Sequence, residues 1–205
     1  MLAGSYYFPA YVASLASRAS SDTVRHGLLE NAWDESGGVH HKSRSHFWLA
    51  ARLNEVLGTT SYEGGEVVIL TPSQNYIAQH LEVCRKGEFE LALGMICLIE
   101  EFTTREFTTI FNALIDSIEV AGDVPVSRFL LDGGSEYFTA NISDDERHRE
   151  EMPRLVYSKF IEENKDLSSE GKINEALFSI EQGMRLSLEL RADFFEKIFE
   201  EVLAT

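Results

Sequence analysis

The chain has 205 residues, of which 44% are hydrophobic and 11% aromatic; this suits a folded protein with a core and excludes a disordered polymer. Its formal net charge of −16 argues against nucleic acid or an anionic membrane as the main partner. The sequence has no run of about 18 apolar residues and no signal-peptide pattern, so we expect no membrane span and no secretion.

Helical periodicity dominates the chain. The pattern predicts helices over residues 9–17, 22–36, 43–57, 72–86, 88–102, 105–121, 136–163 and 172–204. Ser21 or Asp22 suits the N-cap of the second helix. Residues 59–71 read as a loop with a short extended piece, and residues 125–134 as a connection. Seven to eight helices with short loops, and no repeat or linker, predict one all-α helical bundle over residues 1–205.

Isolated cysteines and histidines fit the interior of such a bundle. Cys84 and Cys97 stand in apolar helical contexts, which indicates two free thiols in a reducing, cytoplasmic setting. His26 and His80 have no carboxylate in phase on their helices, so we expect both in the core.

Acidic and imidazole groups gather at three other places. The first is the segment 30–35 with His46 at the next helix start, although His46 also suits a capping or core histidine. The second is Glu100 with Glu101, at the end of the most apolar helix. A carboxylate there needs a partner or a metal unless the helix emerges into solvent, because burial of a lone charge is costly.

The third place is one face of the helix that begins near residue 136. Asn141, Asp145 and His148 stand at i, i+4 and i+7, which places them within roughly 60° of one another around the axis. Asp and His side chains three residues apart on a helix can coordinate one metal ion, as in di-iron helical bundles. The neighbouring Asp144 and other charges leave a solvated face as the alternative.

Arg191 interrupts the apolar stripe that runs from Ile173 to Val202 on the last helix. An inward-pointing Arg needs an anion, which a carboxylate of the bundle or of a substrate would supply. The alternative is a packed stem with the guanidinium in water.

Taken together, these segments resemble the haem-oxygenase-like di-iron oxidases, often called iron-containing redox enzymes. The resemblance rests on four ordered features: the segment 31–37 followed by Ser45-His46, the segment 93–100, the segment 137–148, and a long last helix with Arg191. It implies a haem-oxygenase-like bundle related to the TenA-like and pyrroloquinoline quinone synthesis proteins.

The resemblance also implies a set of metal ligands and neighbouring residues. The ligands would be Glu35, His46, Glu100, Asp145 and His148, with Asn141, Glu101, Asp144 and Arg191 lining the site. Asn141 stands where the family has a His, and the choice between Glu100 and Glu101 rests on spacing alone. An amide binds Fe(II) more weakly than an imidazole does, so the resemblance implies two iron ions in the family and fewer or none here.

The resemblance implies a non-haem iron oxidase or oxygenase that uses O2 on a small organic substrate, such as a carboxylate. Two alternatives stay open: a degenerate, non-enzymatic binding module, which Asn141 motivates, and a metal-free TenA-like hydrolase, for which Cys97 is the candidate group. Because bundles of this type often dimerise, a homodimer stays open as well.

Overall fold

The computed structural model describes residues 2–38, 44–58, 62–63, 66–67, 71–122, 125–163 and 170–203. The described elements are α1 (Leu2–Ala16), α2 (Asp22–Glu35), α3 (His46–Val56), β1 (Tyr62–Glu63), β2 (Glu66–Val67), α4 (Thr71–Lys86), α5 (Phe89–Ala121), α6 (Val126–Leu131), α7 (Glu136–Glu163) and α8 (Glu170–Leu203). The prediction of an all-α bundle is confirmed, and β1 and β2 form only a two-residue antiparallel pair. None of the described helices combines the length and apolar character that crossing a bilayer requires.

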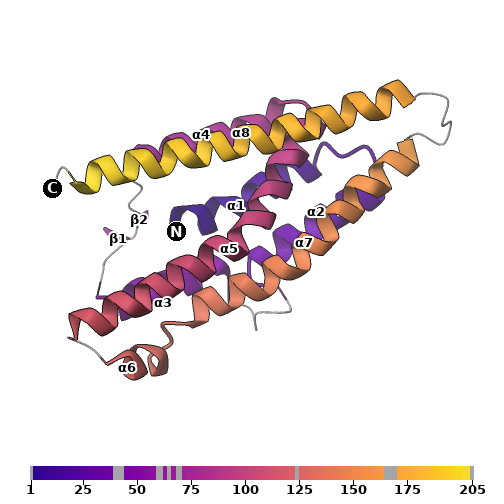
Figure 1. The fold of residues 1–205 in the computed structure, drawn as a ribbon. Helices are drawn as coiled ribbons and strands as arrows, with labels where there is room; N and C mark the ends of the chain where they lie inside the picture. The colour runs from indigo at the N-terminus through magenta and orange to yellow at the C-terminus, as the bar shows by residue number, and fades with distance from the viewer. Residues whose placement is uncertain are drawn as a thin grey trace.

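The bundle has two sides that α5 connects. Figure 1 shows α4 and α8 together along one side and α2, α3 and α7 along the other. Helix α5 crosses from the first side to the second and packs against both α8 and α7 (Figure 1). A residue in the middle of α5 therefore faces helices from both sides.

The first helix begins at Leu2, so the predicted start at Pro9 is wrong. A proline inside a helix costs one backbone hydrogen bond and about 3 kcal/mol. The helical turn before Pro9 is stabilised by packing of its aromatic side chains: Phe8 is buried in the core, and Tyr7 packs against the same cluster. Ser21, by contrast, caps α2 as predicted and accepts a hydrogen bond from the Val24 amide.

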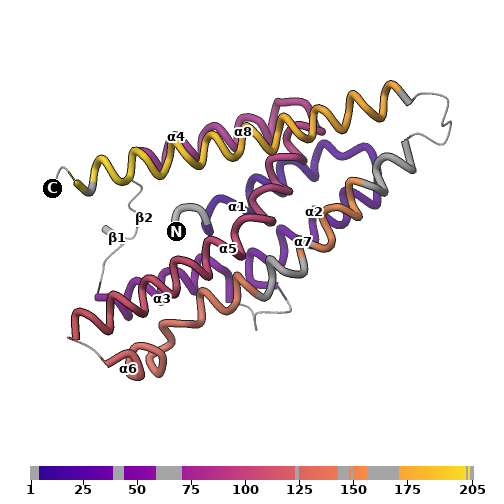
Figure 2. Tube along the Cα trace, in the orientation of Figure 1, coloured from indigo at the N-terminus to yellow at the C-terminus, as the bar shows by residue number. Residues whose placement is uncertain are grey.

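Helix α5 runs without a break from Phe89 to Ala121, so the predicted boundary between residues 102 and 105 is wrong. Figure 2 shows this stretch as one tube between the two sides of the bundle. The Thr103 hydroxyl donates to the Ile99 carbonyl at 2.5 Å, and the Thr108 hydroxyl to the Thr104 carbonyl at 2.8 Å. Because these two hydroxyls bond to carbonyls of the same helix, Thr103 and Thr108 are accommodated within it. The predicted connection at 125–134 also contains the short helix α6.

Helices α5 and α8 touch through two glycines. A Cβ built on Gly94 would lie 2.0 Å from the Ile180 carbonyl oxygen, and one on Gly183 would lie 1.9 Å from the Leu91 carbonyl oxygen. Only glycine permits this approach between two backbones. It holds the central helix against α8.

This glycine contact also sets which face of α8 is buried. Of the predicted stripe, Leu177, Leu188 and Phe199 are exposed, so that prediction is wrong in part. Ile180 of that stripe is buried as predicted, and Ser187 and Leu190, which lie in phase with it and with Gly183, are buried as well. The contact with α5 selects this face, although it is less apolar than the predicted one.

Candidate functional site

Three helices bring one acidic or imidazole side chain each to a common point in the interior. Glu35 comes from the last turn of α2, Glu100 from the middle of α5 and His148 from α7. One potential ligand atom of each lies within 4.8 Å of those of the other two, and all three residues are buried. Such a group is suited to hold a metal ion, and all three residues belong to the predicted ligands.

His148 is the centre of this group and is fully buried. Its Nδ1 atom lies 3.4 Å from Glu100 Oε1 and 3.7 Å from Glu35 Oε1. On the other side of the ring, Nε2 lies 3.8 Å from Asp34 Oδ2. The imidazole therefore turns one nitrogen toward two potential ligands and the other toward a buried carboxylate, an arrangement typical of metal-binding histidines.

His46 contacts Glu35 from the start of α3. Ser45 caps this helix by accepting from the Trp48 amide at 3.1 Å, which makes His46 the first helical residue. His46 Nδ1 lies 2.7 Å from Glu35 Oε2, and both side chains are buried. The structure thus brings His46 to the site as a direct partner of Glu35.

Asn31 holds Glu100 from the opposite direction. It stands one helical turn before Glu35 on α2, so both side chains lie on the same face. Its Nδ2 donates to Glu100 Oε1 at 2.6 Å, in the interior. Asn31 Oδ1 is also buried, and within the described residues it has no hydrogen-bond partner. A buried acceptor of this kind is suited to a metal-bound water or to the ion itself.

The electrostatics of the site fit a cation. Within the described part of the chain, the basic side chains that approach the carboxylates of Glu35 and Glu100 are the imidazoles of His46 and His148. Two buried carboxylates beside imidazoles are stabilised by a divalent ion, and carboxylate and imidazole are ligands that ferrous iron accepts. The residues present therefore fit the metal that the resemblance implies.

The other predicted site residues lie in different surroundings. The side chain of Glu101 is 40% exposed and lies 3.7 Å from Arg105, on the outer side of α5, so Glu100 is the carboxylate that reaches the interior. The helical backbone of α7 includes positions 144 and 145, but the side chains of Asp144 and Asp145 lie outside the described part of the structure.

Asn141, which was predicted to line the site, is buried on α7. Its Nδ2 donates to the Tyr137 carbonyl at 2.7 Å, within its own helix. The Tyr137 hydroxyl in turn makes a hydrogen bond of 2.9 Å with Ser5 of α1. The Asn141 amide nitrogen is therefore directed to the backbone.

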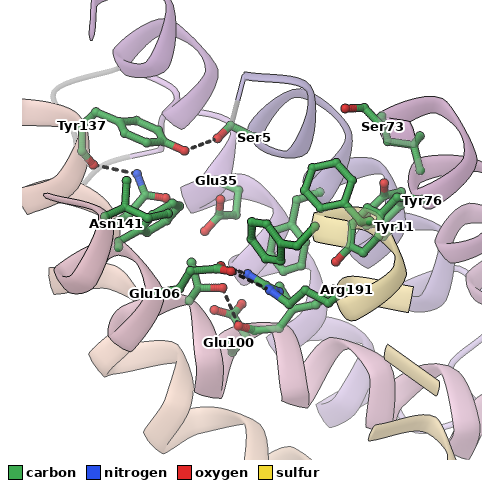
Figure 3. A pocket seen from close by; sticks show the side chains of 18 residues that line it. Ser5, Tyr11, Glu35, Ser73, Tyr76, Glu100, Glu106, Tyr137, Asn141 and Arg191 are labelled. Atoms are coloured by element: carbon green, nitrogen blue, oxygen red, sulfur yellow. Dashed lines mark hydrogen bonds and ion pairs between the residues drawn. The ribbon is translucent and has the colours of Figure 1, made fainter. Parts of the chain in front are cut away.

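A cavity of about 170 Å³ adjoins the metal-binding group. Figure 3 shows Glu35 and Glu100 in its middle, Asn141 and Tyr137 at one end, and Tyr11, Tyr76 and Arg191 toward the other. Its remaining wall is mostly apolar and includes Phe8, Ile77, Ile99, Phe107, Phe194 and Phe195. The arrangement joins a potential metal site to a space for a small molecule.

Arg191 lines this cavity and pairs with a carboxylate of the bundle. Its Nε donates to Glu106 Oε1 at 3.1 Å, and its Nη2 donates to Glu106 Oε2. The two side chains are 16% and 19% exposed, so the pair is largely desolvated. Of the partners considered from the sequence, the structure supplies the bundle carboxylate.

The isolated cysteines and histidines divide into buried and exposed groups. Cys84, Cys97 and His80 are buried as predicted. The core prediction for His26 is wrong: its side chain is 73% exposed, and Nδ1 lies 3.4 Å from Glu30 Oε2 one turn later. Burial, with the nearby Glu100, raises the pKa of Cys97 to about 12, so its thiol stays protonated at neutral pH and is a weak nucleophile.

Four residues of the site were not among the predicted ligands or lining residues: Asn31, Asp34, Glu106 and Tyr11. The first two stand in the segment 30–35, which the sequence had marked only as a cluster. Asn31 and Asp34 precede Glu35 by four and one positions, and helical phase places Asn31 beside Glu35. Glu106 and Tyr11 carry no sequence signal, because their place at the cavity depends on how α5, α8 and α1 pack.

The chain matches a family described as iron-containing redox enzymes over residues 2–172, which include all three converging residues. No curated protein matches the chain.

Proposed function

The chain belongs to the iron-containing redox enzymes, and on that premise we propose that it is a non-haem iron oxidase or oxygenase acting on a small organic substrate. The observation that carries this proposal is the buried convergence of Glu35, Glu100 and His148 beside a cavity. The family supports iron as the metal, and the two carboxylates and the imidazole suit it.

In this proposal the chain holds one iron ion through Glu35, Glu100 and His148. His46 acts on Glu35, as a further ligand or as the hydrogen-bond partner that orients it. Asn31 orients Glu100 in the same way. Partners of this kind fix the direction of a ligand and raise its affinity for the metal.

A second metal position would draw on Asp145 and on position 141. Asn141 is a poorer ligand than the His expected there, and its amide nitrogen bonds to the backbone. We therefore propose that this chain retains one iron more tightly than a second.

When bound, ferrous iron would supply the electrons with which O2 is activated. The chain's own residues hold the ion, place the substrate in the cavity and keep bulk water away. The apolar side chains of Phe107 and Ile99 belong to the wall that does so.

The metal-free hydrolase receives no support, because Cys97 stays a protonated, buried thiol. Experiment must distinguish the proposed iron enzyme from a non-enzymatic binding module. The test is anaerobic Fe(II) loading of purified protein, removal of unbound metal, and metal quantitation. We expect about one tightly held iron per chain, and an oxygen-dependent change in absorbance when air is admitted.

Two neighbouring glutamates offer a matched pair of variants for this test. Glu100→Gln should lose most of the iron, since it removes one charged ligand from the interior. Glu101→Gln removes the same charge from the outer side of α5 and should retain iron like the wild type. Failure of the wild type to retain iron, or equal retention by the two variants, would refute the proposed site.

A further inference from the structure

The cavity limits the size and polarity of a ligand. Its volume of about 170 Å³ is close to the ~150 Å³ of an engineered apolar cavity that accommodates benzene. Phenylalanines from three helices, Phe8, Phe107 and Phe194, contribute to its wall. A ligand that fills this space has the size of a six-membered ring and is mainly apolar.

The charges around the cavity disfavour an anionic ligand. Among the described residues, the charged side chains of its wall are Glu35, Glu100, Glu106 and Arg191. The Arg191 guanidinium already makes a two-point ion pair with Glu106, so its charge is balanced within the protein. In the described part of the wall three carboxylates stand against one guanidinium, and a divalent cation at the metal site brings their formal charge to zero. A carboxylate ligand would add an unbalanced negative charge to a desolvated space.

One polar group of the wall lacks a partner in the described structure. Tyr11 is 1% exposed, and its hydroxyl has no hydrogen-bond partner among the described residues. Its ring is held by stacking on His80, with centroids 5.6 Å apart, and by an edge contact with Phe8. Burial raises the pKa of the Tyr11 hydroxyl above its usual range, which keeps it protonated and able to donate.

Two other polar groups of the wall already make hydrogen bonds. The Thr103 hydroxyl donates to the Ile99 carbonyl, and the Asn141 amide donates to the Tyr137 carbonyl. A buried hydroxyl without a partner costs about 1–3 kcal/mol, which a ligand with an acceptor would recover. The buried Tyr11 hydroxyl therefore gains a hydrogen bond when a ligand offers it an acceptor.

We propose that the ligand of this cavity is an uncharged, mainly apolar molecule of about the size of a six-membered ring that bears one carbonyl or similar acceptor oxygen, and that the Tyr11 hydroxyl donates to this oxygen. This inference rests on the proposed function for the ligand's role as substrate. The binding preference itself does not require iron and can be measured separately.

Three probes of one size test the proposal: cyclohexanone has the acceptor, methylenecyclohexane lacks it, and cyclohexanecarboxylate carries a charge. Dissociation constants are measured by ligand-detected NMR on metal-free protein and on anaerobic Fe(II)-loaded protein. In the wild type, cyclohexanone should bind and cyclohexanecarboxylate should bind more weakly in both forms. The comparison of these two probes needs no variant.

The contribution of the Tyr11 hydroxyl is measured as the affinity for cyclohexanone divided by the affinity for methylenecyclohexane. In Tyr11→Phe, the affinity for cyclohexanone relative to methylenecyclohexane should fall about fivefold, the value of one hydrogen bond. Tyr6→Phe is the matched control, because Tyr6 is 50% exposed, and it should leave the ratio unchanged. Circular dichroism checks that each variant is folded.

Each result decides one of the two proposals. An unchanged ratio in Tyr11→Phe, or tighter binding of the carboxylate than of the ketone, overturns this inference, even when the wild type retains iron. A Tyr11-dependent preference in a protein that retains no iron supports the inference about the ligand and refutes the proposed function.

Discussion

Asn31 of α2 donates a hydrogen bond of 2.6 Å to Glu100 of α5, and both residues are almost fully buried. The bond joins two helices at the point where His148 of α7 comes within 3.4 Å of the same Glu100 oxygen. The direction of the Glu100 carboxylate therefore depends on a neutral amide from a different helix.

We expect Asn31→Ala to weaken Fe(II) binding by about 10–100-fold, because Glu100 loses the partner that orients it. The measurement is a competition titration against a chelator of known affinity under anaerobic conditions. Asn112→Ala is the matched control, since Asn112 is exposed on the outer part of α5. Equal iron affinity in the two variants would contradict the role given to Asn31.

Asn141→His should raise the affinity for iron, because an imidazole on this buried face of α7 is a better ligand than an amide. Asn141 lines the same cavity as Glu35 and Glu100, so the new side chain would begin close to them. Metal quantitation after loading measures the effect. Thr139→His adds the same group at an exposed position of α7 and should change nothing. No gain over this control would mean that the remaining ligands do not converge around position 141.

Gly183→Ala should destabilise the protein by about 3 kcal/mol, since the added Cβ would lie 1.9 Å from the Leu91 carbonyl oxygen and force α5 and α8 apart. Chemical denaturation followed by circular dichroism measures the loss. Gly171→Ala, on the same helix, meets nothing within 4 Å and should be neutral or stabilising by about 0.5 kcal/mol. Similar stabilities for the two variants would show that the helices can separate without cost.

His80 should make stability depend on pH. Burial, the largest effect, lowers its pKa from 6.5 to about 4, so the folded state holds it neutral while the unfolded state binds a proton. Its contribution to stability is present above pH 6.5 and is lost as the pH falls toward 4. The loss is about 3 kcal/mol for a shift of this size.

The measurement is the free energy of unfolding at several pH values in this window. His80→Gln should show a shallower decline with falling pH than the wild type, whatever its absolute stability. His26→Gln is the control, because the His26 side chain is 73% exposed, and its decline should match the wild type. Parallel curves for all three proteins would contradict a depressed pKa at His80.

The class of the fold and most of its helices could be predicted from the order of residues alone. Periodicity acts locally, so an apolar repeat such as that of α4 or α7 is visible in the order of residues alone. Caps such as Ser21 were visible for the same reason. The motifs also pointed to Glu35, His46, Glu100 and His148 as members of one site, and the structure brings these four together.

Features that depend on contacts between distant segments became visible only in the packed helices. Helix α1 continues on both sides of Pro9 because Phe8 packs in the core. The glycine contact between α5 and α8 determines which face of α8 is buried. Glu100 is distinguished from Glu101 because α5 turns only one of them inward. The pairing of Arg191 with Glu106 and the unpartnered hydroxyl of Tyr11 arise from packing between helices far apart in the chain, and packing of this kind leaves no local pattern in the sequence.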